Sequence, residues 1–313
     1  MKTVLTKNFE EAAEFVKRGG VAAFPTETVY GLAARLSEPE AIRKLFEAKT
    51  RPADNPLIAH IGSIEQLGLV AGPINANAQK LIDAFFPGPL TVVLKKLPGV
   101  PEIATAGLDT IGVRMPDNEL ARKFILACGG AVVAPSANLS GRPSPTTWQA
   151  VLEDMDGRIE CILLGEATRI GLESTVVDCT EDVPVVLRKG AISLEQLRTT
   201  VPEARDAGSD TTHEVRSPGL RHRHYSPRAQ VVLVFPDVRI PNDRSAAFIG
   251  LDKPDTEFAL VRVAGSITEY AREVFEFFRE CDRAGVETIY CQAVGEEGIG
   301  AALMDRLRRA AAD

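Results

Sequence analysis

Two short segments combine the residue types that bind phosphates and other anions. Residues 25–32 (PTETVYGL) place two threonine hydroxyls and a carboxylate in a turn directly after an apolar run. Taken alone, this turn is explained as well by threonine capping of the next element. Residues 49–57 (KTRPADNPL) carry Lys49, Arg51 and Asn55 around a proline-rich turn. Two cations and an amide suit a polyphosphate, although a helix end with cations that complement its dipole explains the segment equally well.

A third segment, residues 134–147 (APSANLSGRPSPTT), is the densest in hydrogen-bond donors. Its serines, its asparagine and Arg142 could all turn toward a bound anion, and three prolines stiffen the loop. Its length and donor content favour a function over an ordinary polar loop. Arg114 is the one charge in the apolar run 111–115, so it needs a partner or a polar cleft.

The common motifs for nucleotides, metals and nucleophiles are missing. The sequence has no P-loop and no Gly-x-Ser-x-Gly elbow, and the glycines at 295–300 have the wrong order for a dinucleotide fingerprint. Five cysteines are scattered without a Cys-x-x-Cys pair, and no Cys/His spacing resembles a zinc site. We therefore predict no protein metal site. The hydrogen-bond donors and cations in these segments favour anion binding and charge stabilisation over covalent chemistry.

These segments need a sheet whose strand ends bring them together. Residues 1–205 alternate helix-like and strand-like stretches, which predicts an α/β sheet covered by helices. The predicted strands are 21–24, 57–61, 90–94, 111–115, 131–134, 161–164, 175–178 and 183–188, and the predicted helices are 8–18, 37–49, 75–86 and 119–127.

The rest of the chain divides into a linker and a smaller unit. Residues 206–228 are rich in Asp, Ser, Thr, Gly, Pro and His without an apolar period, which predicts a linker. Residues 229–313 predict a small α/β domain, with strands at 230–235, 246–249, 258–262 and 288–291 and helices at 267–282 and 301–311.

Composition excludes several classes of protein. The 313 residues are 45% hydrophobic and 25% charged, which is enough to build a core without disulfides or metal. No apolar run approaches the ~20 residues of a membrane span, and the N-terminus lacks a signal-peptide core, so we expect a cytoplasmic protein without a membrane partner. Residues 1–205 carry 22 Lys and Arg against 25 Asp and Glu, which weighs against a nucleic-acid module.

The ordered set of segments resembles the YrdC-like family, the L-threonylcarbamoyladenylate synthases. The resemblance also rests on 87–91 (PGPLT), 113–116 (VRMP) and 173–178 (ESTVVD). Residues 217–227 (SPGLRHRHYSP) and 298–307 (GIGAALMDRL) resemble the linker and C-terminal domain of the long form. Each motif is weak alone, but their order along the chain is specific.

The resemblance implies a fold and a reaction. The fold is a twisted, open mixed sheet with helices around a concave groove, plus a small Rossmann-like C-terminal domain. The reaction is a nucleotidyl transfer in which L-threonine, bicarbonate or CO2, and ATP with Mg2+ give threonylcarbamoyl-AMP and pyrophosphate. A partner transferase then uses the product to make N6-threonylcarbamoyladenosine in tRNA, and the resemblance allows a weak tRNA contact.

The resemblance also implies roles for individual residues. Lys49 and Arg51 are the expected catalytic residues. The expected threonine-binding residues are Thr28, His60, Arg114, Ser174 and the backbone of Ala134. The expected ATP-binding residues are Lys49, Arg51, Asn55, Thr110, Ser136, Ser144 and Arg188, with Tyr225 closing over the nucleotide as a lid. No general base is identified: Glu27 could take that role or could orient Thr28 or a basic neighbour.

Two departures from the family pattern and one alternative remain. Residues 220–222 are Leu-Arg-His where Met-Lys-Tyr is usual, and Lys189 replaces a proline that usually follows Arg188. These changes put the closing contacts of the lid and the position of Arg188 in question. The alternative function is a module that binds double-stranded RNA, which would need many basic phosphate contacts.

Overall fold

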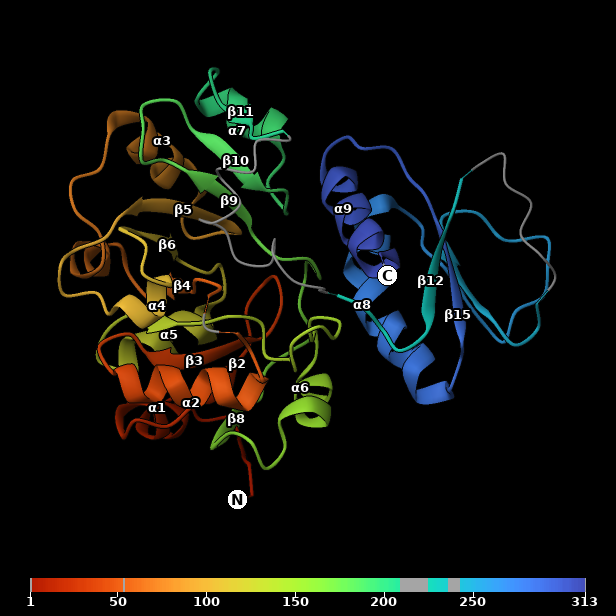
Figure 1. Ribbon diagram of the computed structural model, residues 1–313, viewed down its shortest axis with the longest axis horizontal. Coiled ribbons are helices and arrows are strands. Elements are labelled where there is room, and N and C mark those ends of the chain that lie inside the picture. The colour runs from red at the N-terminus through yellow and green to blue at the C-terminus, as the bar shows by residue number, and fades with distance from the viewer. Residues whose placement is uncertain (1, 53, 209–224, 236–242, 313) are drawn as a thin grey trace.

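The computed structural model of the chain describes residues 2–52, 54–208, 225–235 and 243–312. These residues form two lobes, a larger N-terminal one and a smaller C-terminal one (Figure 1). Most of the predicted linker 206–228 lies outside the described residues, including the Leu-Arg-His departure at 220–222.

The N-terminal lobe is built on an 11-stranded mixed sheet. Its strand order is β1-β8-β2-β3-β7-β4-β6-β5-β9-β10-β11. The strands are β1 (Val4–Thr6), β2 (Ala22–Phe24), β3 (Gly31–Arg35), β4 (Ile58–His60), β5 (Leu90–Lys95), β6 (Thr110–Arg114), β7 (Val132–Val133), β8 (Cys161–Leu163), β9 (Thr175–Asp178), β10 (Val185–Arg188) and β11 (Arg205–Asp206).

Helices cover this sheet. They are α1 (Phe9–Lys17), α2 (Pro39–Lys49), α3 (Ala76–Phe85), α4 (Glu102–Thr105), α5 (Glu119–Ala127), α6 (Trp148–Met155) and α7 (Leu194–Thr200), with a 3-10 helix at Ile64–Leu69. Local sequence explains where several begin. The Asn8 side chain accepts hydrogen bonds from the backbone N–H groups of Glu10 and Glu11, and Asn75 and Asn118 cap α3 and α5 in the same way.

The register of the central strands sets up the functional site. Strands β4 and β6 pair in parallel with His60 opposite Arg114, so these two polar side chains leave the same face of the sheet side by side. Strand β7 pairs antiparallel with both β3 and β4, and the loop that follows it crosses the same region. The apolar residues of these strands are buried, most of them in two core clusters that lie in the N-terminal lobe, which makes the platform rigid.

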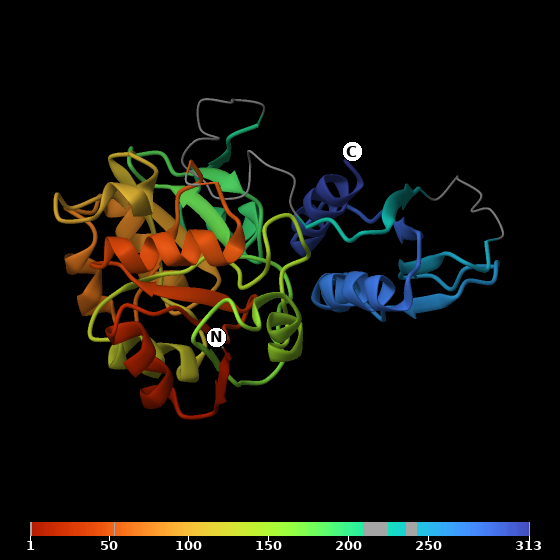
Figure 2. The same ribbon diagram turned by 60° about the horizontal axis from the view of Figure 1, so that its bottom comes forward.

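The C-terminal lobe has a four-stranded parallel sheet of order β12-β15-β13-β14. Its strands are β12 (Gln230–Val234), β13 (Ala247–Gly250), β14 (Leu260–Val263) and β15 (Thr288–Gln292). Helices α8 (Ile267–Ala284) and α9 (Ile299–Ala311) lie on the side of this sheet that faces the N-terminal lobe (Figures 1 and 2). No helix in the described ranges is both long and apolar enough to cross a membrane.

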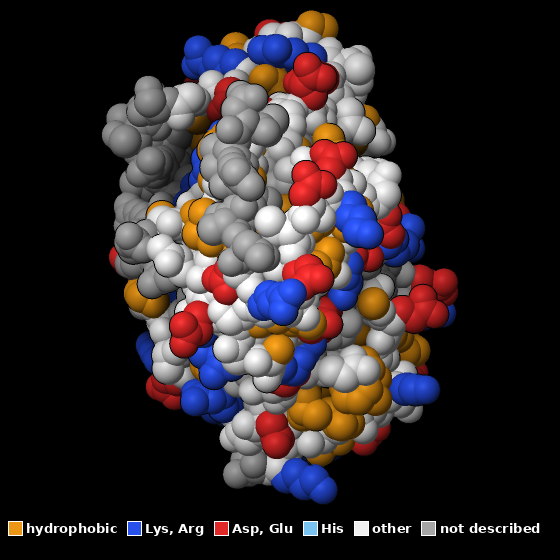
Figure 3. Space-filling model, turned by 90° about the vertical axis from the view of Figure 1, so that its right-hand side faces the viewer, with side chains coloured by type: hydrophobic (Ala, Val, Ile, Leu, Met, Phe, Trp, Pro, Cys, Tyr) orange, Lys and Arg blue, Asp and Glu red, His pale blue; other side chains and the backbone are white. Residues whose placement is uncertain are grey.

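The opposite face of the C-terminal sheet points outward. Strand β14 alternates between Leu260, which packs on the core with the helices, and Val261 and Val263, which are 46% and 45% exposed. A view of this side of the molecule shows apolar side chains gathered among charged ones (Figure 3). The C-terminal lobe therefore uses its helical face, not its outer face, against the rest of the chain.

The structure confirms the predicted fold class and most predicted elements, with clear exceptions. Strand β3 was not predicted, because Gly-Leu-Ala-Ala-Arg has little strand propensity; burial between β2 and β7 forms it. Helices α6 and α7 were also missed. Both helices are short. The sequence signal for α7 is a capping box, in which the side chains of Ser193 and Gln196 each accept a hydrogen bond from the other residue's backbone N–H.

Candidate functional site

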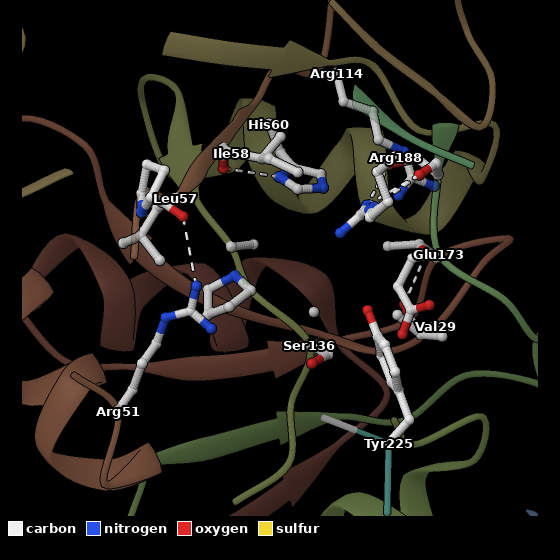
Figure 4. A pocket seen from close by; sticks show the side chains of 16 residues that line it. Val29, Arg51, Leu57, Ile58, His60, Arg114, Ser136, Glu173, Arg188 and Tyr225 are labelled. Carbon is white, nitrogen blue, oxygen red and sulfur yellow. Dashed lines mark hydrogen bonds between the residues drawn. The ribbon is translucent and has the colours of Figure 1, made fainter. Parts of the chain in front are cut away.

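A pocket opens where loops from six strands of the large sheet meet (Figure 4). Its walls come from the turn after β2, the loop between α2 and β4, the ends of β4, β6 and β10, the loop after β7 and the segment before β9. Tyr225, which precedes the C-terminal lobe, completes it. The predicted site residues that line the pocket are Arg51, His60, Arg114, Ala134, Ser136, Ser174, Arg188 and Tyr225.

One end of the pocket holds His60 and Arg114. Both are buried, and burial together with the charge of Arg114 lowers the pKa of His60 to about 3. The imidazole is therefore neutral near pH 7. Its Nδ1 lies 3.2 Å from the carbonyl of Ile58, and a proton assigned to Nδ1 leaves Nε2 as an acceptor. A guanidinium beside a neutral acceptor can bind the carboxylate of a small zwitterion and one of its donors.

Arg188 and Ser174 form the adjoining wall. The Arg188 guanidinium donates to the Ser174 carbonyl at 2.9 Å and to the Ser174 hydroxyl at 3.2 Å. The same hydroxyl lies 2.8 Å from Oγ1 of Thr91 on β5, which fixes it from the other side. Burial lowers the pKa of Arg188. Arg188 lines the pocket although Lys189 follows it.

Arg51 projects into the pocket from the loop after α2. Its Nη2 lies 3.4 Å from the carbonyl of Pro56, and burial lowers its pKa to about 10, so it still carries its charge near pH 7. The loop begins at Thr50, which has a left-handed φ of 49°. With Arg188, Arg51 gives the pocket two cations beyond Arg114, as anion binding requires.

Lys49 does not line the pocket. Its side chain is buried, and Nζ donates to the carbonyls of Ser136 and Asn138, the second at 2.5 Å. The Lys49 carbonyl also accepts from the backbone N–H of Ser140 at 3.0 Å. Burial lowers the pKa of Lys49 well below its ordinary value. In the structure Lys49 thus holds the loop after β7 in place, while its catalytic role stays a prediction.

Four other predicted residues are buried and are not among the residues that line the pocket. Thr28 contacts the lining through the 2.9 Å approach of its hydroxyl to that of Thr26. Asn55 lies in the Arg51 loop, Ser144 donates to Glu173 at 2.6 Å, and Thr110 begins β6. Thr28, Asn55 and Ser144 thus contact residues that line the pocket, and the ligand contacts of all four residues stay predictions.

Sequence reasoning missed two charged residues of the site, Glu173 and Arg306. Glu173 lines the pocket, and Arg306 reaches it from α9 of the C-terminal lobe, with its Nε 2.8 Å from Glu173 Oε2. The Arg306 guanidinium also lies 5.0 Å above the Tyr225 ring and donates to the carbonyl of Lys189 at 3.0 Å. On its other side the Tyr225 ring stacks on Phe275. Only the tertiary fold brings residues 173, 225 and 306 together.

In the ranges that the structure describes, no group of three or more His, Cys, Asp or Glu side chains could hold a metal ion. The pocket carboxylate, Glu173, is engaged by Ser144 and Arg306.

Comparison with known proteins places the chain in a family. A family model described as "Telomere recombination" (Sua5, YciO and YrdC) matches residues 14–190. The chain belongs to this Sua5/YciO/YrdC family. A second model, described as "Threonylcarbamoyl-AMP synthase, C-terminal domain", matches residues 192–312, as in the long form of the family.

Individual relatives of this family align with almost the whole chain. The threonylcarbamoyl-AMP synthase of Pyrococcus abyssi is 44% identical, with 96% of this chain and 92% of that protein covered. The enzyme of that name from Bacillus subtilis is 39% identical, with the same coverage. A crystal structure of P. abyssi Sua5 complexed with L-threonine superposes with a TM-score of 0.90, at 42% identity and over 99% of this chain and 97% of that one.

Proposed function

We propose that this chain is a threonylcarbamoyl-AMP synthase, a nucleotidyltransferase that joins L-threonine, bicarbonate or CO2, and ATP. The observation that carries the proposal is the pocket itself. Arg114 and a neutral His60 stand at one end, while Arg51 and Arg188 provide further positive charge. An amino acid and a polyphosphate are the pair of ligands that this arrangement suits, and the synthase relatives are similar over nearly the whole chain.

The threonine end uses directed hydrogen bonds. The Arg114 guanidinium pairs with the α-carboxylate, because its fork of donors matches two carboxylate oxygens. The neutral His60 accepts from the amine or hydroxyl through Nε2. Ser174, held by Thr91 and Arg188, offers a further hydroxyl. A protonated histidine could not accept, and the lowered pKa of His60 keeps the imidazole neutral well below pH 6.5 as well.

The nucleotide end uses charge. Arg51 and Arg188 offset the negative charge of the phosphates, and Ser136, whose hydroxyl donates to Oδ1 of Asn138 at 2.5 Å, lines this part of the pocket from the loop that Lys49 holds. Mg2+ supplies additional charge neutralisation when it enters bound to ATP. The threonine amine adds to CO2 and loses a proton to solvent, which gives a carbamate. One carbamate oxygen then attacks the α-phosphorus in line, the bond from this phosphorus to the α,β-bridging oxygen breaks, and pyrophosphate leaves. Positioning accounts for most of the acceleration, since two unstable reactants must meet.

Tyr225 keeps water away from the reacting groups. Its side chain is buried between Phe275 and Arg306, and the next residue, Ser226, donates its backbone N–H to the Gly141 carbonyl at 2.9 Å. Carbamates and acyl phosphate anhydrides decompose in water, so a covered site protects both. The product would pass to a transferase in the cytoplasm that modifies tRNA.

Pyrophosphate release tests the proposal. The purified chain is incubated with ATP, Mg2+, bicarbonate and L-threonine, and each of the last two is omitted in turn. We expect release that needs both, with threonylcarbamoyl-AMP detected by mass spectrometry. Release without threonine would indicate another acceptor or an ATPase, and absence of release with tight duplex-RNA binding would support the RNA-binding alternative.

A further inference from the structure

A buried carboxylate stands directly behind the threonine end of the pocket. The Glu27 side chain is 1% exposed, and its Oε1 lies 2.7 Å from Nη2 of Arg114, whose side chain is 5% exposed. Neither Glu27 oxygen has a hydrogen-bond partner of good geometry among the described residues. The charge of Arg114 is therefore what compensates this carboxylate, because a buried ion without a partner is strongly unfavourable.

The backbone around Glu27 is fixed on both sides. The Thr26 hydroxyl accepts from the backbone N–H of Thr28 at 3.1 Å and donates to the Val29 carbonyl at 2.7 Å. The Glu27 carbonyl accepts from the backbone N–H of Ile170 at 2.9 Å. The backbone of Glu27 is therefore held in place. An arginine side chain has four rotatable bonds, so it adopts one orientation only when a fixed partner holds it.

Arg114 also has a cationic neighbour in the pocket, Arg188, which makes the anchor more important. It lies close enough to Arg188 to help lower the pKa of that residue, and it contributes to the low pKa of His60. Without Glu27, repulsion would favour a guanidinium turned away from the pocket. Arg114 lines the pocket and Glu27 does not, so Glu27 acts on a substrate only through Arg114.

We infer that Glu27 is a positioning residue that holds Arg114 in the orientation that binds the α-carboxylate of the amino-acid substrate. The inference rests on the proposed function, which makes that substrate L-threonine. It also removes Glu27 as a general base, because a base must contact the proton that it accepts.

The experiment separates amino-acid affinity from chemistry. For Glu27→Gln, which removes the charge and keeps the shape, we expect the KM for L-threonine to rise about tenfold, while kcat and the KM for ATP stay within about twofold. The Kd for L-threonine, measured by calorimetry without ATP, should rise by a similar factor. The conservative variant Glu27→Asp keeps the charge and should show a smaller rise.

Glu119→Gln is the matched control. Glu119 and Glu27 both line a second groove, which lies between the turn after β2 and the start of α5, but the Glu119 carboxylate is exposed and pairs with Lys123. We expect no change in the KM or Kd for L-threonine in this variant. Circular dichroism shows whether each variant is folded, and Glu27→Asp provides the test if Glu27→Gln is not.

Two results would overturn the inference. One is a large fall in kcat for Glu27→Gln with an unchanged threonine KM and a lost acidic limb of the pH profile, which would assign proton transfer to Glu27. The other is unchanged KM and Kd for threonine. Failure of the proposed function is recognised separately: the wild type would release no threonine-dependent pyrophosphate, and the calorimetric Kd would still decide the role of Glu27.

Discussion

The two lobes use buried charge in different ways. The N-terminal lobe buries charged and polar side chains around its own pocket, among them His60, Arg114 and Arg188. Of the described residues after 228, the buried charged ones are Arg279 and Arg306. Both extend into the other lobe: Arg279 binds Asp154 at 2.8 Å and the Pro143 carbonyl at 2.6 Å, and Arg306 binds Glu173.

This difference shows that the C-terminal lobe supplies positive charge to buried carboxylates of the N-terminal lobe. Asp154 and Glu173 are buried carboxylates of the N-terminal lobe whose cationic partners come wholly or partly from helices α8 and α9. Burial alone would raise the pKa of Glu173, but Arg306 and Arg188 lower it, so Glu173 stays ionised and ties the lobes together. The predictions below test whether these cross-lobe arginines differ from the others.

The largest effect is expected for Arg306→Met. Removing Arg306 leaves Glu173 buried without its main partner, which should lower the free energy of unfolding by about 3 kcal/mol. Urea denaturation, followed by tryptophan fluorescence and circular dichroism, measures the loss. Arg308→Met is the control on the same helix, because Arg308 forms an exposed pair with Glu296. Equal losses in the two variants would contradict the special role of Arg306.

Arg51→Ala tests the pocket of the N-terminal lobe. Removing this cation should lower kcat/KM for ATP about 100-fold, because charge on the phosphates is no longer offset. Pyrophosphate release measures the change. Arg43→Ala is the control, since Arg43 lies on the preceding helix and forms an exposed pair with Glu40. Near-normal ATP use by Arg51→Ala would rule out its assignment to the nucleotide end.

The lowered pKa of His60 leads to a prediction of how the free energy of unfolding depends on pH. Its pKa is about 3 in the folded chain against an ordinary value of 6.5, so the unfolded chain binds more protons between these values. The contribution of His60 is complete above pH 6.5 and is lost progressively as the pH falls toward 3. The His60→Gln variant should therefore lose less stability than the wild type between pH 7.5 and pH 5 in urea denaturation. Parallel losses would show that His60 is not buried in its neutral form.

The smallest effect is expected for Arg262→Gln. Arg262 pairs with Glu273 and Glu280 within the C-terminal lobe, and about a third of its side chain is exposed. Its loss should lower the free energy of unfolding by less than about 1 kcal/mol and leave pyrophosphate release unchanged. A loss as large as that of Arg306→Met would remove the contrast between arginines that cross to the other lobe and arginines that do not.

The sequence predicted the chemistry of the site better than its geometry. Loop composition and family resemblance identified the segments that meet at the pocket, and Arg114 in an apolar strand signalled a buried partner. The identity of that partner was open, because Glu27 lies 87 residues away and only the pairing of β4 with β6 and the turn after β2 bring the two together. Lys49 shows the reverse case: its type suggested phosphate, but its Nζ is occupied by two carbonyls.

The same physical reason explains the missed fold elements. Strand β3 is a strand because its neighbours bury it, and the contacts of Glu173 with Arg306 depend on how two lobes pack. Local preferences carry little information on either. Helices with capping residues and an apolar face, such as α1 and α5, were predicted closely because the information that specifies them is local.

The pairing of β1 with β8 has a consequence for synthesis. Val4 in the first strand pairs with Cys161, and β2 pairs with the same strand. At common translation rates, roughly 8 to 30 seconds pass between the emergence of these partners from the ribosome. During that time β2 exposes an apolar edge that only β8 will cover. Arg188 joins the pocket later still, and Glu173 gains its partner Arg306 only after a further 133 residues have been made, so the site is completed only after most of the C-terminal lobe has been synthesised.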